Sequence, residues 1–388
     1  MSSGEEGSVA GTATATLAGA IDELFGAEPA VFADGDTVLA LHRQLERLQA
    51  LLTRATAGFD SAHEWENDGA RSAAAWIAHH RRLPTWATRR RVCQGRALRH
   101  MDLTEAAFCA GDINEAHVEV LVRARSKAGA EAFGQAEEML LGYARDLRYG
   151  HFLRAVSYWL QVIDPDGTER DDEALHAARP LHLSRGFYGS WVLDGQLDPT
   201  AGAAVAKVLK AIEEELFETD WAEARARVGE KVCAADLART PAQRRADALV
   251  EMARRAAASP PGSRLPEPLF TVLVGYETFA GRICELADGT VVAPGSLLRW
   301  MDQAWVERVV FDSPDRVRNV GVRRRIFTGA TRRAVEVRDR ECFHDYCDVP
   351  AEDCEIDHVI PWAAGGPTVE SNGRPACRYH NRHRHRRT

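Results

Sequence analysis

Four residues near the C-terminal end have the types and spacing of a metal site. Cys342 and Cys347 lie five positions apart, and Cys377 and His380 lie three apart. Residues three apart share one side of a helix, so Cys377 and His380 can both face the other two residues. Three cysteines and one histidine are a ligand set of closed, tetrahedral structural zinc sites. We therefore predict a structural Zn²⁺ here; the alternative is that all four are ordinary buried side chains.

The distribution of the cysteines also favours a metal over disulfide bonds. The chain has eight cysteines, and four of them fall within residues 342–377. We expect a cytoplasmic chain, in which thiols stay reduced and such a cluster binds metal. Cys354 is the spare thiol of the segment and is expected in the core. A segment of about 65 residues buries little apolar surface, so a zinc staple would also stabilise it.

A carboxylate and an imidazole lie side by side between the two halves of the cluster. Asp357 and His358 are flanked by branched aliphatic residues, which predicts a strand that ends at Pro361. Neighbours on a regular strand point to opposite faces, so the two side chains can converge only where the strand ends or kinks. The Gly365–Thr368 turn then brings Asn372 back opposite them.

This order of motifs resembles that of HNH endonucleases, which have a ββα-metal fold of two strands and a helix. The resemblance covers residues 335–385 and rests on Cys-x₄-Cys, Asp-His, Gly-Gly-x-Thr, Asn and Cys-x₂-His in sequence. It implies that Asp357 binds a catalytic divalent cation, Mg²⁺ or another, and that His358 is the general base. It also implies that Asn372 braces the loop between the strands and so orients His358, and that the Cys/His set binds zinc.

The last motif position departs from the commonest pattern of the family. Asn381 follows His380 where many relatives have a second histidine. The family includes a version with Asn at this place, and a carboxamide oxygen is an acceptable, neutral ligand for a hard cation. We therefore assign Asn381 to the catalytic set, as a cation ligand beside Asp357. His385, four residues further on, is the substitute candidate.

The end of the chain is basic although the whole chain carries a formal charge of −8. Residues 374–388 contain six Arg, three His and no acid, which indicates an anionic partner. The resemblance implies that this partner is DNA, double-stranded by preference, held through its phosphates. The candidate phosphate-binding residues share or follow the last predicted helix: Arg378, Arg382, Arg384, Arg386 and Arg387.

Together these features predict a metal-dependent endonuclease that hydrolyses DNA phosphodiester bonds. His358 would activate water, and the divalent cation would stabilise the leaving group. A second hypothesis is a zinc-stapled DNA-binding module without catalysis, which would need none of Asp357, His358 and Asn372. A third is a structural or interaction protein whose helical body is the working part; a homo-oligomer is left open.

The elements before this segment are predicted to be mainly helical. Residues 1–35 are rich in Ala, Gly, Thr, Ser and acids, so we expect a flexible tail with a short helix near 21–25. Leucines then recur at helical spacing on one face between 41 and 52. Further helices are predicted at 72–80, 86–100, 114–127, 131–147 and 151–162, and a turn at 164–167.

Strands enter in the second half. The pattern predicts strands at 181–183, 188–197, 270–274, 290–292, 308–311 and 317–322, helices at 199–217 and 240–258, and a linker at 259–263. The predicted class is α+β: a mainly helical N-terminal region with a small β part, then a zinc-stapled ββα-metal, treble-clef-like HNH domain. The predicted domains are the tail at 1–35, a helical α+β domain at 36–322 and the nuclease domain at 323–388.

The body also resembles a known family, the domain of unknown function 222. The resemblance rests on residues 239–252, on the Leu-Asp-Pro segment at 197–199 and on the segment around Trp76. That region commonly precedes HNH domains in high-GC bacteria. It implies an architecture and no chemistry of its own.

One basic stretch within the body allows two interpretations. Residues 69–101 contain eight Arg and no acid, and a break at Leu83–Thr85 separates two predicted helices. This fits a DNA-binding helix-turn-helix, or an ordinary helical hairpin whose Arg side chains are solvated or pair with acids elsewhere. No run of 18 apolar residues is present, and Glu5 and Glu6 stand where a signal peptide has positive charge, so no membrane contact is expected.

Overall fold

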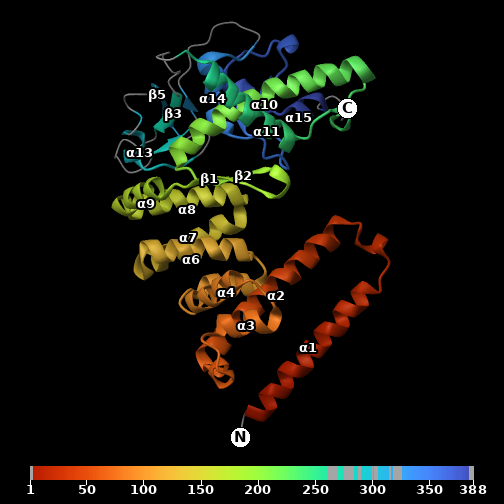
Figure 1. Ribbon diagram of the computed structural model, residues 1–388, viewed down its shortest axis with the longest axis vertical. Helices are drawn as coiled ribbons and strands as arrows, with labels where there is room; N and C mark the ends of the chain where they lie inside the picture. The colour runs from red at the N-terminus through yellow and green to blue at the C-terminus, as the bar shows by residue number, and fades with distance from the viewer. Residues whose placement is uncertain are drawn as a thin grey trace. The chain divides into compact units, whose positions relative to one another are not determined.

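The computed structural model describes residues 3–260, 269–274, 284–286, 290–298, 300, 305–313, 316–317 and 326–383 (Figure 1). The chain divides into two compact units, Met1–Val156 and Ser157–Thr388, and each is described by itself. The described elements up to the end of the first unit are all helical. They are α1 (Ser3–Phe25), η1 (Pro29–Phe32), α2 (Gly35–Ala62), η2 (Glu64–Asp68), α3 (Ala73–Arg81), α4 (Thr85–Leu98), α5 (Asp102–Ala110), α6 (Glu115–Ala128), α7 (Ala130–Asp146) and α8 (Tyr149–Ile163).

The N-terminal segment is helical where the sequence predicted a flexible tail. α1 covers most of that tail, and the short helix expected at 21–25 is only its last part. Ala, Leu and Glu recur in α1, and these residues have high helix propensity. A lack of bulky core residues therefore did not prevent helix formation here.

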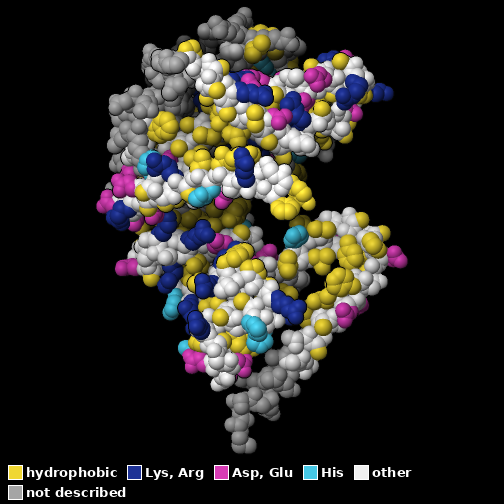
Figure 2. All heavy atoms as spheres, in the orientation of Figure 1, with side chains coloured by type: hydrophobic (Ala, Val, Ile, Leu, Met, Phe, Trp, Pro, Cys, Tyr) yellow, Lys and Arg dark blue, Asp and Glu magenta, His cyan; other side chains and the backbone are white. Residues whose placement is uncertain are grey.

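The leucine face predicted for the first long helix belongs to α2, and its leucines are exposed to solvent. Leu41, Leu45 and Leu48 are 39%, 48% and 37% exposed, and Figure 2 shows hydrophobic side chains gathered on the two N-terminal helices. The buried positions of α2 are small or polar: Ala50, Thr53, Thr56, Ala57 and Asp60. Small residues are needed because α4 approaches closely, and a Cβ on Gly95 would lie 2.8 Å from the Cβ of Ala57.

The core of the first unit lies among α5, α6 and α7. Its fully buried large side chains include Phe108, Leu121, Phe133 and Leu140. Glu137 of α7 is also buried, and it accepts hydrogen bonds from Thr104 N at 2.9 Å and Thr104 Oγ1 at 2.7 Å. This buried carboxylate fixes the start of α5, a helix that the sequence pattern did not predict.

The basic stretch at 69–101 forms a helical hairpin of α3 and α4. Arg96 makes two hydrogen bonds to the buried Asp60, at 2.7 and 2.8 Å. Arg90 pairs with Glu115 at 3.3 Å and Glu119 at 3.5 Å. These arginines are thus engaged by acids of their own unit, which favours the ordinary hairpin over a DNA-binding motif.

The second unit begins with a helix where the sequence predicted a turn. α9 (Pro165–Ala178) starts after Asp164, whose carboxylate accepts a hydrogen bond from Gly167 N at 2.9 Å. Asp-Pro-Asp-Gly suits a turn and a capped helix start equally, since both need a side-chain acceptor followed by proline. The antiparallel strands β1 (Leu181–Arg185) and β2 (Trp191–Gly195) follow, as the alternation predicted.

Asp198 fixes the start of α10 (Pro199–Val228). It accepts hydrogen bonds from Ala201 N at 2.9 Å and Thr200 Oγ1 at 2.8 Å, and its other oxygen lies 2.8 Å from His176 Nδ1. Burial raises the pKa of Asp198, but these hydrogen bonds outweigh burial and lower the pKa to about 2. The Leu-Asp-Pro segment is therefore a helix cap.

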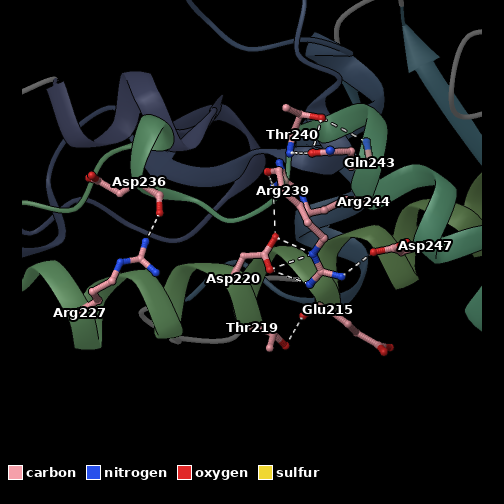
Figure 3. A network of polar contacts seen from close by, with 10 residues as sticks. All are labelled: Glu215, Thr219, Asp220, Arg227, Asp236, Arg239, Thr240, Gln243, Arg244 and Asp247. Carbon is pink, nitrogen blue, oxygen red and sulfur yellow. Dashed lines mark hydrogen bonds and ion pairs between the residues drawn. The ribbon is translucent and has the colours of Figure 1, made fainter.

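Buried ion pairs join α10 to α11 (Pro241–Ala258), as Figure 3 shows. Asp220 of α10 is 2% exposed and accepts hydrogen bonds from Arg239 Nη2 at 2.6 Å and Arg244 Nη1 at 3.4 Å. Burial raises the pKa of Asp220, but the two arginines outweigh burial and lower it. Thr240 caps α11 with Pro241 at its first position, as predicted.

A four-stranded sheet has the order β4-β3-β5-β6. β3 (Leu269–Val274) and β5 (Trp305–Ser313) are parallel, and β4 (Glu285–Leu286) and β6 (Arg316–Val317) pair with them in antiparallel fashion. The strand predicted at 290–292 is a single bridge at Val291, before α13 (Pro294–Leu298). Residues 261–263 of the predicted linker and 318–322 of the last predicted strand lie outside the described residues.

The last elements form a ββα module. β7 (Glu355–His358) pairs antiparallel with β8 (Gly373–Ala376), and α15 (Arg378–His383) follows. α14 (Gly329–Asp339) packs against β8, η5 (Ala351–Asp353) and η7 (Glu370–Asn372). The predicted α+β class with a C-terminal ββα module is confirmed, whereas the predicted domain boundaries stay predictions. Within the described part of the chain, no helix is long and apolar enough to cross a membrane.

We predict that Asp220→Ala lowers the free energy of unfolding by about 3–5 kcal/mol, because it leaves Arg244 buried without its carboxylate. Chemical denaturation followed by circular dichroism measures this change. The lowered pKa of Asp220 means that its contribution is present above the ordinary carboxyl pKa and is lost as the pH falls below about 4.

Asp247→Ala is the matched control. Asp247 pairs with Arg239 at 2.9 Å, but its side chain is 54% exposed, so we expect a change below about 1 kcal/mol. Equal losses in the two variants at neutral pH would contradict the role given to the buried pair.

Candidate metal centre and active site

The three cysteines and the histidine of the predicted zinc site lie together. Cys342, Cys347, Cys377 and His380 each offer one ligand atom, and all four atoms lie within 4.8 Å of one another. Cys342 Sγ is 3.4 Å and Cys377 Sγ is 3.2 Å from His380 Nδ1. Soft thiolate and imidazole donors in such a group could hold a metal such as zinc.

The thiols of this cluster differ in their local electrostatics. Burial raises the pKa of Cys342, but hydrogen bonds from Cys377 N and His344 N outweigh burial and lower it. Burial raises the pKa of Cys347 to about 11. Cys354 is more buried still, with its Sγ 3.8 Å from Val349 O, and burial raises its pKa. Cys354 packs against the cluster as the expected core thiol.

The loop between Cys342 and Cys347 holds His380 from outside the ligand set. The His344 ring stacks on the His380 ring with centroids 4.0 Å apart and planes 5° apart. Cys342 N donates to Val349 O at 2.8 Å and Phe343 N donates to Pro375 O at 2.8 Å, which fix the loop. His344 was not predicted as a site residue, although its place inside the Cys-x₄-Cys loop was a signal for it.

Asp357 lies on β7 opposite Arg374 of β8. Arg374 Nη2 is 3.4 Å from Asp357 Oδ2, and the Asp357 side chain is 12% exposed. The Arg374 guanidinium also lies 4.1 Å from the centre of the Phe343 ring. The carboxylate thus lies beside a cation that is itself held by the cysteine loop.

His358 is the last residue of β7 and is 9% exposed. Its Nε2 lies 2.9 Å from Thr368 Oγ1, and its ring packs against Phe327 with centroids 4.6 Å apart. Asp357 and His358 therefore contact different partners, as neighbours on a strand do. Thr368 was part of the predicted turn motif but was not predicted as a site residue.

Asn372 braces the loop between β7 and β8. Its Oδ1 accepts a hydrogen bond from Ile360 N at 2.8 Å, and its Nδ2 donates to Pro367 O at 2.8 Å. Val359 N donates to Asn372 O at 2.9 Å. Gly366 must be glycine because a Cβ there would collide with the carbonyl of Ile360. The loop that follows His358 is thus closed on itself by one buried carboxamide.

Asn381 points its carboxamide to the start of β7. Its Nδ2 donates a hydrogen bond to Glu355 Oε2. Glu355 and Asp357 are two residues apart on β7, so they share one face of the strand. Asn381 therefore contacts Glu355, and Asp357 shares a strand face with Glu355. Glu355 was not predicted as a site residue. Residue alternation in the strand could have revealed it.

The predicted phosphate-binding arginines are only partly described. Arg378 is the first residue of α15, and its guanidinium pairs with Glu214 and Glu218 of α10. The side chain of Arg382 lies outside the described residues, and so do Arg384, His385, Arg386 and Arg387. The choice between Asn381 and His385 as a ligand therefore stays a prediction.

Two family models match adjacent parts of the chain. The model described as domain of unknown function (DUF222) matches residues 36–339, and the model described as HNH endonuclease matches residues 342–387. The chain belongs to the DUF222 family. The resemblance seen in the sequence is thus confirmed: a DUF222 region is followed by an HNH endonuclease domain.

The relatives that match this DUF222 chain are themselves described as uncharacterized proteins. Uncharacterized proteins Rv2100 and MT2160 of Mycobacterium tuberculosis are each 53% identical over 47 residues, which is 12% of this chain and only 8% of theirs. Uncharacterized protein Rv3776 of the same species is 26% identical over 388 residues, 89% of this chain and 70% of its own length. No solved structure matches the chain significantly.

We predict about one tightly held zinc per chain and its loss in Cys377→Ser, because a tetrahedral site loses a thiolate that closes it. Elemental analysis of the purified chain measures the metal. Circular dichroism of the same samples should show reduced stability of the variant.

Cys354→Ser is the matched control, since Cys354 is buried beside the cluster but outside the ligand set. It should keep its zinc. A purified chain without zinc, or a Cys377→Ser variant with the wild-type content, would contradict the assignment.

Proposed function

We propose that the HNH domain of this chain is a metal-dependent endonuclease that hydrolyses DNA phosphodiester bonds. The observation that carries the proposal is the held position of His358. It is buried at the end of β7, its Nε2 lies 2.9 Å from Thr368 Oγ1, and the following loop is braced by Asn372. A histidine whose ring is held in one position is suited to general base catalysis.

The contact with Thr368 supports a tautomer of His358 in which Nε2 carries the proton. When Nε2–H donates to Thr368 Oγ1, the lone pair resides on Nδ1. Nδ1 would take the proton of the attacking water, whose oxygen forms the new bond to phosphorus while the bond to the leaving oxygen breaks. Asn372 acts through the loop and not on the substrate, so it is a positioning residue.

The oxygen donors of β7 and α15 fit a hard divalent cation. Asp357 and Glu355 supply carboxylates and Asn381 a carboxamide, which are ligand types that Mg²⁺ and similar ions prefer. A cation bound there would neutralise charge that develops on the phosphate and on the leaving oxygen. Arg374, beside Asp357, would hold the carboxylate in position before the cation binds.

The Cys₃His cluster has a structural role in this proposal. Cys377 and His380 frame the start of α15, and Cys342 and Cys347 belong to the loop that packs on β8. Zn²⁺ on these residues would hold α15 against β7, where Asn381 meets Glu355. The basic residues of α15 and beyond would grip the phosphates of double-stranded DNA.

A zinc-stapled DNA-binding module without catalysis is the second candidate. The ion pair between Arg374 and Asp357 favours it, because the carboxylate then already has a cationic partner. The braced loop around His358 favours the nuclease, since phosphate binding alone does not need a buried imidazole on a closed loop.

We predict that His358→Ala abolishes plasmid nicking in Mg²⁺ or Mn²⁺ and leaves DNA affinity within about twofold of wild type. The general base acts on water, so its loss lowers the rate by about 10²–10⁴-fold without removing a DNA contact. Nicking is followed on agarose gels, and affinity by fluorescence anisotropy with a labelled duplex.

His182→Ala, at an exposed position of β1, is the matched control and should nick at the wild-type rate. Wild-type nicking by His358→Ala would remove the general-base role. A wild-type chain that binds DNA and never nicks it in either metal would support the binding module instead.

The Mg²⁺ dependence of nicking distinguishes whether Asn381 or His385 is the cation ligand. If Asn381 is a cation ligand, Asn381→Ala should raise the Mg²⁺ concentration for half-maximal nicking by about tenfold or more, because one of few protein ligands is lost. Asn381→His should retain activity, since imidazole is also a metal ligand. Normal nicking by Asn381→Ala together with an inactive His385→Ala would transfer the role to His385.

A further inference from the structure

One side of α10 faces the HNH domain with charged residues at helical spacing. Lys210, Glu214 and Glu218 lie four residues apart, and Phe217 lies three after Glu214, so these residues form one stripe. The neighbouring acids Glu213 and Glu215 lie about 100° to either side of Glu214 and pair with α11. Glu213 pairs with Arg245 at 3.4 Å and Glu215 with Arg255 at 2.5 Å, and both arginines lie on α11.

The stripe holds Arg378, the first residue of α15. Arg378 Nη2 donates to Glu214 Oε1 at 2.7 Å and also to Glu218 Oε1. The same guanidinium lies 5.0 Å from the centre of the Phe217 ring. Two carboxylates thus meet the edge of this planar group while an aromatic ring lies against its face.

A contact of the opposite sign lies one helical turn away. Lys210 Nζ is 2.8 Å from Glu352 Oε1, and it also pairs with Asp353 of η5. α10 therefore presents one cation and then two acids, and the HNH domain presents two acids and then one cation. A shift of α10 by one turn would place like charges together, so this complementarity fixes the register of the contact.

The Asp220 network keeps Phe217 in place for this contact. Arg244 lies 5.2 Å from the centre of the Phe217 ring, so the ring lies near two guanidinium groups, those of Arg244 and Arg378. Arg244 is itself held by Asp220 and by the carbonyl of Arg239 at 2.6 Å (Figure 3). The DUF222 motif at 239–252 thereby supports the side of α10 that meets the HNH domain.

We propose that α10 competes with DNA for Arg378, with Glu214 and Glu218 taking the place of a backbone phosphate. This inference rests on the proposed function, which makes Arg378 a phosphate ligand. A pair of carboxylates offers a guanidinium the same anionic oxygens as a phosphate group does. DNA must then displace two acids of the DUF222 region before Arg378 can bind it.

The competition raises the threshold for DNA binding and does not block it. The Glu214 and Glu218 side chains are 54% and 58% exposed, and exposed ion pairs are weak and screened by salt. A duplex that engages the whole basic end of the chain can therefore outcompete them. Non-specific encounters that offer only a few phosphates cannot.

A double-mutant cycle on the full chain tests the competition. Affinity for a labelled DNA duplex is measured by fluorescence anisotropy at fixed salt, without added divalent cation. Glu214→Gln/Glu218→Gln should bind about three- to tenfold more tightly, as expected for the loss of two exposed ion pairs. Arg378→Gln should cost more affinity in that double variant than in the wild type, because only there is Arg378 released.

Glu223→Gln is the matched control for Glu218→Gln, since it removes one charge from an exposed position of the same helix. An equal gain in DNA affinity in these two single variants would mean that net charge alone causes the gain, and this would overturn the proposal. Additive effects in the cycle, or weaker binding by Glu214→Gln/Glu218→Gln, would overturn it as well. Zinc content and circular dichroism confirm that each variant is folded.

The binding measurement separates this inference from the proposed function. Coupling between the glutamates and Arg378 in a chain that never nicks DNA would support the competition and contradict the nuclease. Nicking that depends on His358, without coupling between the glutamates and Arg378, would support the nuclease and contradict the competition. A wild-type chain and variants that all fail to bind the duplex would overturn both.

Discussion

The convergence of three cysteines and one histidine is the interaction on which the rest of the HNH domain depends. β7 and β8 have four residues each and α15 has six. A two-stranded ribbon and a helix of that length are marginal by themselves in water. The cluster ties the loop after Cys342, the end of β8 and the start of α15 to one point. The placement of Asn381 beside Glu355, and of Arg378 beside α10, follows from that tie.

Local signals allowed much of the fold to be predicted, and failed where one signal fits two structures. Thr240-Pro241 predicted a helix start correctly because a cap followed by proline has few other uses. Asp164-Pro165 carried the same signal, yet the nearby glycine also suits a turn. Leucine spacing located α2 but not its buried side, because the side that packs on α4 is selected for small residues. Periodicity identifies a helix face; the neighbouring element decides whether that face is covered.

Some residues of the candidate site could be predicted from local sequence signals, and others could not. Cys342, Cys347, Cys377 and His380 could be predicted because ligand chemistry restricts both residue type and spacing. Thr368 could not, because it gains its role from His358, ten residues earlier in the chain. Strand alternation places Glu355 on the face of Asp357, but its partner Asn381 comes only 26 residues later. The partners of Arg378 lie 160 and 164 residues away. No local pattern encodes contacts at such separations, so the sequence suggested phosphate as the partner of a residue that the fold pairs with acids.

The charge distribution explains why those acids matter for a DNA-directed domain. The chain carries −8 overall, while residues 323–388 contain 13 Arg and 10 Asp or Glu, so the residues before them carry the excess negative charge. More than half of that excess lies in residues 1–35, which hold six acids and no Lys or Arg. At physiological salt this charge acts over only about 8 Å, so a distant acidic body neither repels nor steers DNA strongly. Acids influence the basic end only by direct contact. α10 provides that contact, and the buried Asp220 with its two arginines gives α10 a fixed side to present. In the proposed competition, the DUF222 region adjusts through this one helix the phosphate affinity of the HNH domain that follows it.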